Sequence, residues 1–432
     1  MSTPTSVYIK EVTLIDFKSF RKENKFSFVD ANDNLCRWTV FLGNNNTGKT
    51  NLLKAIASLE PTLDTGGQKK EYFALGFNKN VIPRETIQGS VLGINIYPPI
   101  TKSKNEPKNL NSDLIYTYKE GHRSSGRLND DDKLQNLSIY GYGVTREIEK
   151  KGISTENTNR LNADNLFYNT KLINFEDWLF QLDYAANNKM AADIKKTADI
   201  NTKAARSRDL LTTVLKSEIF PEVNDIRFIS DENLTNYIEF QTEDGWHRLS
   251  ELGYGYQASL SWMVDFCKKL FDRYPDSENP LKEPAVLLID EIDLHLHPQW
   301  QRTIIKHLSN IFSATQFIVT THSPFIIQSM EHVNLYTLQR EKDHTIVNHL
   351  GDRSFIGWGI EEILREIMGL EDNIQTDRYQ KLIHQFDEAL NKDNYRNGKE
   401  AYDGLKKILH PQSVERKLLD IQFTQLTPDD KA

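Results

Sequence analysis

The sequence predicts an α/β fold built on a buried parallel sheet, with an inserted helical subdomain and a helical C-terminal tail. Three observations support this prediction. An apolar stretch at residues 37–42 is followed by a glycine-rich loop and by apolar residues at helical spacing in 51–59. A second apolar run, 285–289, ends in acidic residues. A third, 317–319, ends in hydroxyl and histidine side chains. Continuous apolar strands are typical of parallel sheets covered on both faces.

The composition is that of a globular protein and excludes several classes. The chain has 432 residues, 38% of them hydrophobic, with 53 Lys and Arg against 61 Asp and Glu. The net charge of −8 excludes a uniformly basic nucleic-acid coat but not a local basic patch. Cys36 and Cys267 are too few for a four-thiolate zinc site. No apolar run approaches the roughly 18 residues of a membrane span, and the first residues lack a secretory signal. We expect a soluble cytoplasmic protein.

The spacing of apolar residues predicts the other elements in chain order. Residues 7–20 mix β-branched and aromatic side chains with polar ones, which predicts a hairpin or edge strands. Residues 137–146 predict a short strand ending in a glycine turn, and 175–215 have helical spacing. Further strands are expected at 226–240 and 246–249, and a helix near 299–312.

The chain beyond Gly351 is charged, and we expect it to be helical. Apolar residues recur there at intervals of three and four, first from Ile360 to Met368 and again from Tyr379 to Leu390. Two interpretations stay open: these stripes dock a partner, or they pack on the protein's own core.

These patterns predict five regions. Residues 61–136 are rich in Gly, Asn, Lys and Ser, which indicates a solvated insert or long surface loops. The sequence has no sustained heptad pattern, which argues against a long coiled-coil arm. The predicted regions are a first core half at 1–60 and 137–149, the polar insert at 61–136, a helical subdomain at 150–220, a second core half at 221–350 and a helical C-terminal region at 351–432.

The segment from Gly43 to Thr50 reads GNNNTGKT and fits the phosphate-loop pattern G-x-x-x-x-G-K-S/T. Glycines let backbone amides turn toward phosphate oxygens, and Lys49 adds a positive charge. The Thr50 hydroxyl suits Mg²⁺, and the following helix begins at Asn51. The predicted nucleotide-binding residues here are Gly43, Asn44, Asn46, Thr47, Gly48, Lys49, Thr50 and Asn51.

Two further strand ends carry candidate chemistry. AVLLIDEID places Asp290 to hold Mg²⁺ and Glu291 to polarise an attacking water. The alternative is a buried strand that ends in solvated acids. FIVTTHS places His322 to bond the γ-phosphate or hold the water, and the alternative is a structural histidine. His295 and His297 do not have zinc-site spacing, and a connecting loop fits them better.

The segment LSELGYGYQASL, which starts at Leu249, predicts a glycine turn that leads into a helix. The amides at the helix N-terminus are able to face a phosphate, although in isolation the segment indicates no more than a turn.

Taken in order, the four segments resemble the ABC-type ATPases, in particular the soluble branch that includes RecF, Rad50 and the OLD-family ATPases. The corresponding segment of that branch is similar to DEIDLHLHPQWQ in this sequence. The tail segment GWGIEEILREIMGL resembles the end of antiphage ATPases of the Septu type (PtuA-like), including retron-associated relatives. The resemblance covers roughly residues 7–60, 137–146 and 246–335, and the insert carries none of it.

This resemblance implies two heads that assemble as a dimer or higher oligomer and hold ATP and Mg²⁺ between them. It implies metal roles for Thr50 and Asp290, a catalytic base at Glu291 and a switch histidine at His322. It also implies a D-loop at Asp293–His297 and a partner-facing signature segment. The signature residues would be Gly253, Gly255, Tyr256 and Gln257.

The sequence departs from the family pattern at two places. Gly253 stands where the family has a serine that meets the partner head's γ-phosphate, so one hydroxyl donor is lost. The glutamine that usually follows the second strand has no clear counterpart, and neither Gln135 nor Tyr140–Arg146 matches it.

The motifs are compatible with three functions to different degrees. The first is an antiphage ATPase that gates an associated nuclease of the HNH type and meets nucleic acid through that complex, because no nuclease motif occurs in this sequence. The second is a DNA-stimulated repair ATPase, for which a basic groove is required. The third, a membrane-transporter subunit, fits neither the insert nor the tail. The candidate groove residues are Lys18, Arg21, Lys22 and Lys25.

Overall fold

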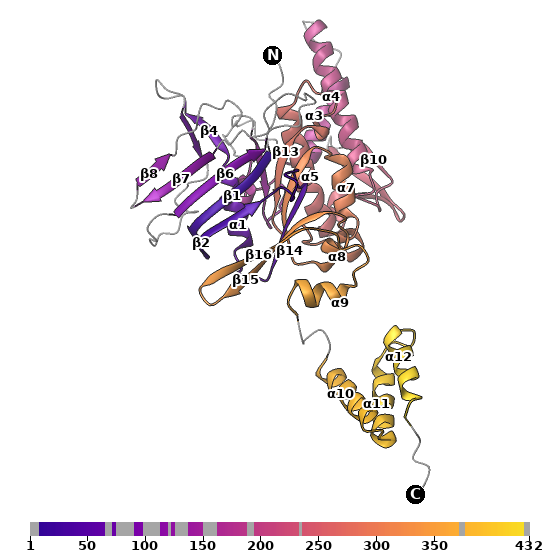
Figure 1. Ribbon diagram of the computed structural model, residues 1–432. Helices are drawn as coiled ribbons and strands as arrows, with labels where there is room; N and C mark the ends of the chain where they lie inside the picture. Colours follow the sequence, from indigo (N-terminus) through magenta and orange to yellow (C-terminus); the bar gives the residue numbers. More distant parts are fainter. Residues whose placement is uncertain are drawn as a thin grey trace. The chain divides into compact units, whose positions relative to one another are not determined.

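The structure is a computed structural model that describes residues 8–64, 71–74, 90–97, 113–119, 122–125, 137–149, 162–187, 194–232, 236–370 and 376–426. The chain divides into two compact units, Met1–Trp358 and Gly359–Ala432 (Figure 1). Within the ranges above, every helix is too short or too polar to cross a membrane.

A six-stranded sheet forms the core of the first unit. Its strand order is β16-β15-β3-β14-β13-β9, and only β16 runs antiparallel to its neighbour. The predicted apolar strands are present, and the carboxyl ends of the parallel strands meet at one edge. The strands are β3 (Trp38–Gly43), β9 (Ile139–Tyr142), β13 (Ala285–Ile289), β14 (Thr315–Thr321), β15 (Val333–Glu341) and β16 (His344–Arg353).

A second, antiparallel sheet has the order β2-β1-β6-β7-β8. The predicted hairpin is present as β1 (Tyr8–Phe17) and β2 (Phe20–Ser27), and the insert adds β6 (Ser90–Tyr97), β7 (Asp113–Lys119) and β8 (His122–Ser125). Of the two alternatives for 61–136, a solvated insert or long surface loops, the described residues therefore show an insert with strands. The physical reason is that β6 pairs with β1, a partner far away in sequence. A separate pair, β4 (Pro61–Asp64) and β5 (Glu71–Ala74), belongs to the same insert.

Helix α1 (Lys49–Ala57) packs on the core sheet and shares a buried cluster with β1 and β2 of the second sheet. Leu53 and Ile56 of this helix share one buried cluster with Phe26 of β2 and Leu288 of β13. Burying an aliphatic or aromatic side chain of this size contributes about 1.5–3 kcal/mol. This packing holds the start of α1, and with it the loop that precedes α1, against the carboxyl edge of the core sheet.

Helix α5 (Tyr254–Arg273) packs on the core strands through aromatic contacts. The rings of Phe266 and Tyr140 lie 5.2 Å apart, and those of Trp262 and Tyr142 lie 5.9 Å apart. These contacts fix α5 relative to β9. The shorter helices of this region are α6 (Pro298–Gln301), α7 (Ile304–Ile311) and α8 (Pro324–Gln328).

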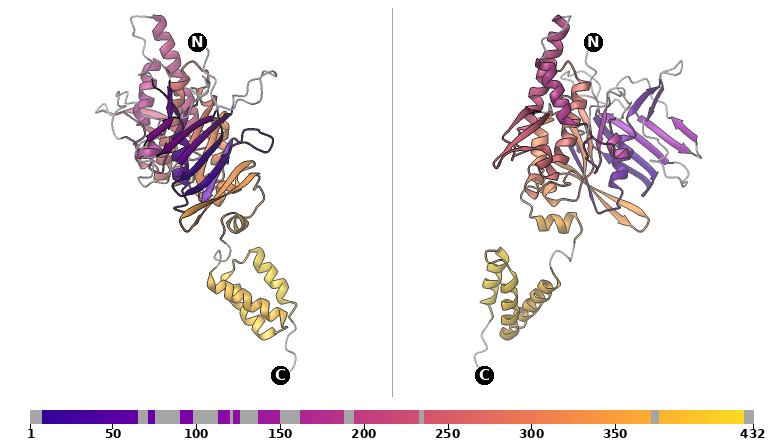
Figure 2. Two further views of the ribbon diagram at one scale, coloured as in Figure 1. Left: turned by 60° about the vertical axis from the view of Figure 1, so that its left-hand side comes forward. Right: turned by 180° about the vertical axis from the view of Figure 1, so that it is seen from behind.

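The predicted helical subdomain contains α2 (Asp164–Tyr168), α3 (Phe175–Asn187) and α4 (Ile194–Leu215), and α4 projects beyond the sheets (Figures 1 and 2). Residues 150–161 of that predicted region lie outside the described residues. A small sheet follows and packs on α3, with Phe175 and Phe240 in ring contact. Its strands are β10 (Asp225–Ser230), β11 (Asn236–Thr242) and β12 (Gly245–Arg248).

The second unit is helical and has its own core. After α9 (Ile360–Glu362) comes a π-helical turn at Ile363–Ile367, then α10 (Asp377–Asn391), α11 (Tyr395–Ile408) and α12 (Val414–Phe423). The predicted start of this region at residue 351 is wrong, because β16 continues to Arg353 in the core sheet. The second apolar stripe packs internally: Phe386 of α10 is buried with Leu405 and Leu419.

Candidate nucleotide site at the carboxyl edge of the core sheet

The loop between β3 and α1 needs its glycines. A Cβ atom at Gly43 would lie 2.4 Å from the carbonyl oxygen of Leu338, and Gly48 has a φ of 96° that L side chains rarely adopt. Thr47 closes the loop, since its hydroxyl donates to the carbonyl of Asn44 at 2.9 Å. The loop is therefore set by steric limits that only these residue types meet.

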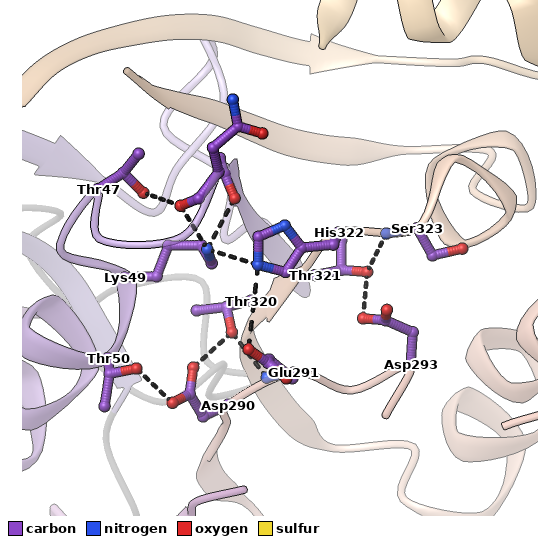
Figure 3. A network of polar contacts seen from close by, with 12 residues as sticks. Thr47, Lys49, Thr50, Asp290, Glu291, Asp293, Thr320, Thr321, His322 and Ser323 are labelled. Atoms are coloured by element: carbon purple, nitrogen blue, oxygen red, sulfur yellow. Dashed lines mark hydrogen bonds and ion pairs between the residues drawn. The ribbon is translucent and has the colours of Figure 1, made fainter. Parts of the chain in front are cut away.

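Lys49 lies inside this loop (Figure 3). Its ammonium donates to the carbonyl oxygens of Gly43 at 2.7 Å and Asn44 at 3.0 Å, and to Nε2 of His322 at 2.8 Å. Burial lowers the pKa of Lys49, and Asp290 and the other nearby carboxylates oppose that shift. A phosphate group would give the ammonium a charged acceptor in place of neutral carbonyls, which roughly doubles the strength of such hydrogen bonds.

Asp290 directly follows β13 and is 1% exposed. Its two carboxylate oxygens accept hydrogen bonds from the hydroxyl groups of Thr50, at 2.5 Å, and Thr320, at 2.7 Å. Thr50 and Asp290 thus place a hydroxyl and a carboxylate oxygen side by side next to the phosphate loop. Mg²⁺ prefers oxygen ligands of this kind and is usually held by one or two carboxylates with waters and phosphates, so this pair fits that ion.

Glu291 lies one residue further, in a left-handed backbone conformation with a φ of 48°. Its amide donates to the hydroxyl of Thr320 at 2.7 Å. Its carboxylate lies 3.9 Å from Nε2 of His322, and both side chains are partly exposed (Figure 3). Glu291 is therefore able to reach a water molecule beside the phosphate loop, while the more buried Asp290 is not.

His322 follows β14 and accepts a hydrogen bond from Lys49. Burial and the neighbouring Lys49 charge lower the pKa of His322, which keeps the ring neutral. The residues on either side are tied down: the hydroxyl of Thr321 donates to Asp293 at 2.5 Å and accepts from the amide of Ser323 at 2.9 Å. The histidine is thus held in place beside the predicted phosphate loop.

The predicted signature segment lies against the turn that follows β13. A Cβ atom at Gly255 would lie 2.2 Å from the carbonyl oxygen of His295, whereas Gly253 has open space around it. Tyr256 is buried, and its ring lies 4.5 Å from that of Trp300. The side-chain amide of Gln257 donates through Nε2 to the carbonyl of Leu252 at 2.8 Å. Tyr256 and Gln257 therefore support local structure, and a nucleotide role for the segment stays a prediction.

Other residues singled out in the sequence have local partners. Lys18, in the turn between β1 and β2, donates to the side chain of Asn51 at 2.9 Å. His297 caps α6 by accepting the amide of Gln299 at 3.4 Å. The ring of His295 contacts that of Tyr254.

Two residues at the site were not predicted. Thr320 links Asp290 to Glu291, and Arg146, which follows β9, donates to the backbone carbonyl of Asp290 at 2.8 Å. Thr320 lies inside the recognised FIVTTHS segment, so a hydroxyl within a buried strand was the available signal. Arg146 belongs to the 140–146 segment that was compared with the missing glutamine, while Gln135 lies outside the described residues.

The sheet presents its polar groups in the order of the ABC-type ATPases. The phosphate loop after β3, the histidine after β14 and the acidic pair after β13 meet on neighbouring strands. Fold and site together define an ABC-type ATPase head. Residues 39–328 match the protein family described as "AAA domain, putative AbiEii toxin, Type IV TA system". This match covers more than half of the chain, and the chain belongs to that family.

Similar proteins confirm the resemblance to the Septu-type ATPases. The chain is 34% identical over 207 residues to the Septu protein PtuA of Bacillus thuringiensis, which is 47% of this chain and 52% of that protein. It is 26% identical over 394 residues to the Septu protein PtuA of Bacillus mycoides (strain KBAB4). This match covers 87% of this chain and 47% of that protein. The chain therefore spans about half the length of these two relatives.

A third relative is associated with a retron. The "Retron Vc95 probable ATPase" of Vibrio cholerae serotype O1 biovar El Tor is 24% identical over 377 residues, which cover 75% of this chain and 72% of that protein.

The lowered pKa of His322 predicts a pH-dependent stability. As pH falls through about 6.5, the ordinary pKa of histidine, the unfolded chain binds a proton at this position before the folded chain does. The free energy of unfolding therefore decreases there. We expect His322→Asn to lose less stability than the wild type between pH 7.5 and 5.5 in urea unfolding. The control is His384→Asn, at an exposed position. Equal losses of unfolding free energy in wild type and H322N would contradict the prediction.

Proposed function

We propose that this chain is an ATPase of antiphage defence whose nucleotide-dependent assembly gates an associated nuclease. The observation that carries the proposal is the convergence of Lys49, Thr50, Asp290, Glu291 and His322 at one sheet edge. The defence role rests on similarity to Septu and retron-associated ATPases.

In the proposed reaction, the loop amides and Lys49 bind the β- and γ-phosphates. Thr50 and Asp290 would hold Mg²⁺, which would supply positive charge next to the phosphate oxygens. Glu291 orients the attacking water and accepts its proton, because its carboxylate is accessible while its backbone is fixed. His322 stays neutral and donates or accepts a single hydrogen bond at the γ-phosphate.

We propose further that two heads close on the nucleotide. The signature segment begins with Gly253 at the N-terminus of α5, whose first amides are free to meet an anion. Exposed apolar side chains flank the site: Tyr254 in this segment and Val144 in the loop after β9. Closure of a second copy over this edge would bury them and supply the signature segment in trans.

The proposed partner is an HNH-type nuclease that docks on the C-terminal unit. The stripe on α10 packs inside that unit, but α12 leaves Val414, Leu418 and Ile421 exposed by 66%, 53% and 60%. Their spacing of four and three residues places them on one face of the helix. An exposed apolar stripe of this kind is a feature of surfaces that bind other proteins.

The alternative of a DNA-stimulated repair ATPase has less support. Lys18 bonds Asn51, and Lys25 pairs with Glu23 at 3.2 Å. Two of the four residues proposed for a basic groove are therefore engaged within the chain.

The first test is steady-state ATP hydrolysis by wild type and Glu291→Gln, with and without duplex DNA. We expect slow turnover in the wild type that does not respond to DNA, and loss of turnover with retained ATP binding in the variant, because the water loses its base. Lys49→Ala should instead lose binding. Hydrolysis that rises with DNA and falls in E291Q would favour the repair function.

A second test restores the missing hydroxyl at position 253. Gly253 has open space and an ordinary φ of −54°, so a serine fits there without strain. If the partner head's γ-phosphate meets this position, Gly253→Ser adds one hydrogen-bond donor, and we expect ATP-dependent dimerisation to tighten about tenfold. The measurement is sedimentation in the presence of ATP of proteins that also carry Glu291→Gln. Gly253→Ala in the same background is the control. Equal dimerisation of the two variants would argue against closure through this segment.

A third test places charge on α12. Leu418→Glu with Ile421→Glu should abolish copurification of a coexpressed HNH-type nuclease while ATP hydrolysis stays at the wild-type level, because the two residues are exposed. Tyr184→Glu, at an exposed position of α3, serves as the control. Undiminished copurification of the double variant would remove α12 as the docking surface.

A further inference from the structure

Arg146 is buried beneath the acidic turn at the end of β13. Only 3% of it is exposed. Its Nη2 atom donates to the carbonyl oxygens of Asp290 at 2.8 Å and Glu291 at 2.9 Å, and its Nε atom donates to the carbonyl of Gly143 at 3.2 Å. One guanidinium thus joins the loop after β9 to the two residues that carry the acidic pair.

The backbone of this turn is held on every side. The amide of Asp290 donates to the carbonyl of Tyr142, that of Glu291 to the hydroxyl of Thr320 and that of Ile292 to the carbonyl of Thr320. Arg146 donates to the carbonyl groups of Asp290 and Glu291, and the carbonyl of Glu291 also accepts from the amide of Leu294 at 3.0 Å. Glu291 has a positive φ, a conformation that costs a non-glycine residue about 1–3 kcal/mol and persists only where surrounding contacts enforce it.

The guanidinium of Arg146 is buried and only partly satisfied by these contacts. Burial lowers its pKa to about 10, and the carboxylates of Asp290, Asp293 and Glu291 oppose this shift. Its Nη1 atom is buried without a hydrogen-bond partner in the described part of the chain. A buried donor left unpaired costs about 1–3 kcal/mol, and apolar side chains often fill such a position at no loss of stability.

We propose that Arg146 is a positioning residue for hydrolysis: it holds the strained turn so that the Glu291 carboxylate faces the attacking water. The inference rests on the proposed role of Glu291 as the base. Arg146 acts through the backbone of Asp290 and Glu291, and Lys49 already supplies the cation of the phosphate loop. Its loss therefore affects the rate of the chemical step and leaves the affinity for ATP unchanged.

The chain contains a matched control. Arg37 is half-buried, and its Nη2 atom donates to two carbonyl oxygens, those of Ser309 at 2.6 Å and Phe312 at 2.5 Å. It precedes β3 and therefore lies at the opposite edge of the sheet from the phosphate loop. Arg37→Met removes the same kind of contact as Arg146→Met, but away from the site.

The experiment compares Arg146→Met, Arg146→Lys, Arg37→Met and Glu291→Gln in the full chain. It measures single-turnover hydrolysis, the dissociation constant of a non-hydrolysable ATP analogue and hydrogen exchange of the amides of residues 290–292. We expect R146M to slow hydrolysis about 100-fold, as a small misplacement of a catalytic group does. Analogue affinity should stay unchanged, and protection of the turn amides should fall. R146K should be intermediate, because an ammonium lacks the planar fork.

Three results would overturn the inference. A rate in R146M equal to that of the wild type, with E291Q inactive, would remove Arg146 alone and leave the proposed function intact. Equal losses of rate and affinity in R146M would assign Arg146 a direct nucleotide contact or a general structural role. Losses in R37M that match those in R146M would have the same meaning. Full turnover by E291Q would instead remove the base, and both proposals with it.

Discussion

The buried carboxylate of Asp290 is the constraint on which the site depends. It lies at the end of a strand covered on both faces, where an unpaired charge would be strongly unfavourable. Hydroxyl groups from Thr50 of α1 and Thr320 of β14 satisfy one oxygen each. Because these two partners come from two elements and Asp290 itself follows a third, the carboxylate fixes the phosphate-loop helix, the acidic strand and the histidine strand relative to one another.

The neighbouring groups use the order that Asp290 establishes. Thr320 donates to Asp290 and accepts from the amide of Glu291, so one hydroxyl connects the metal-type carboxylate with the proposed base. His322 follows two residues later and reaches Lys49. The charged groups of the site are therefore held in place by contacts within the protein, as electrostatic stabilisation of a transition state requires.

The start of α5 is in tight contact with the turn after β13, whereas the C-terminal unit has a core of its own. Gly255 lets the start of α5 approach the carbonyl of His295 so closely that any side chain would clash. The turn after β13 and the start of α5 are thus coupled by direct backbone contact, with no room for a side chain between them. The C-terminal unit has its own buried core around Leu405, so it keeps its shape independently of this coupling.

The phosphate loop, Asp290, Glu291 and His322 were readable from the sequence alone, because each lies directly after a contiguous apolar strand. Composition and spacing also predicted the parallel sheet and the helices at 175–215. Only the tertiary structure placed Arg146 under the acidic turn, joined β6 to β1 and carried the core sheet through β16 to Arg353. Those features depend on pairing between residues that are distant in sequence, and local periodicity does not encode which distant partners a strand or a buried charge will meet.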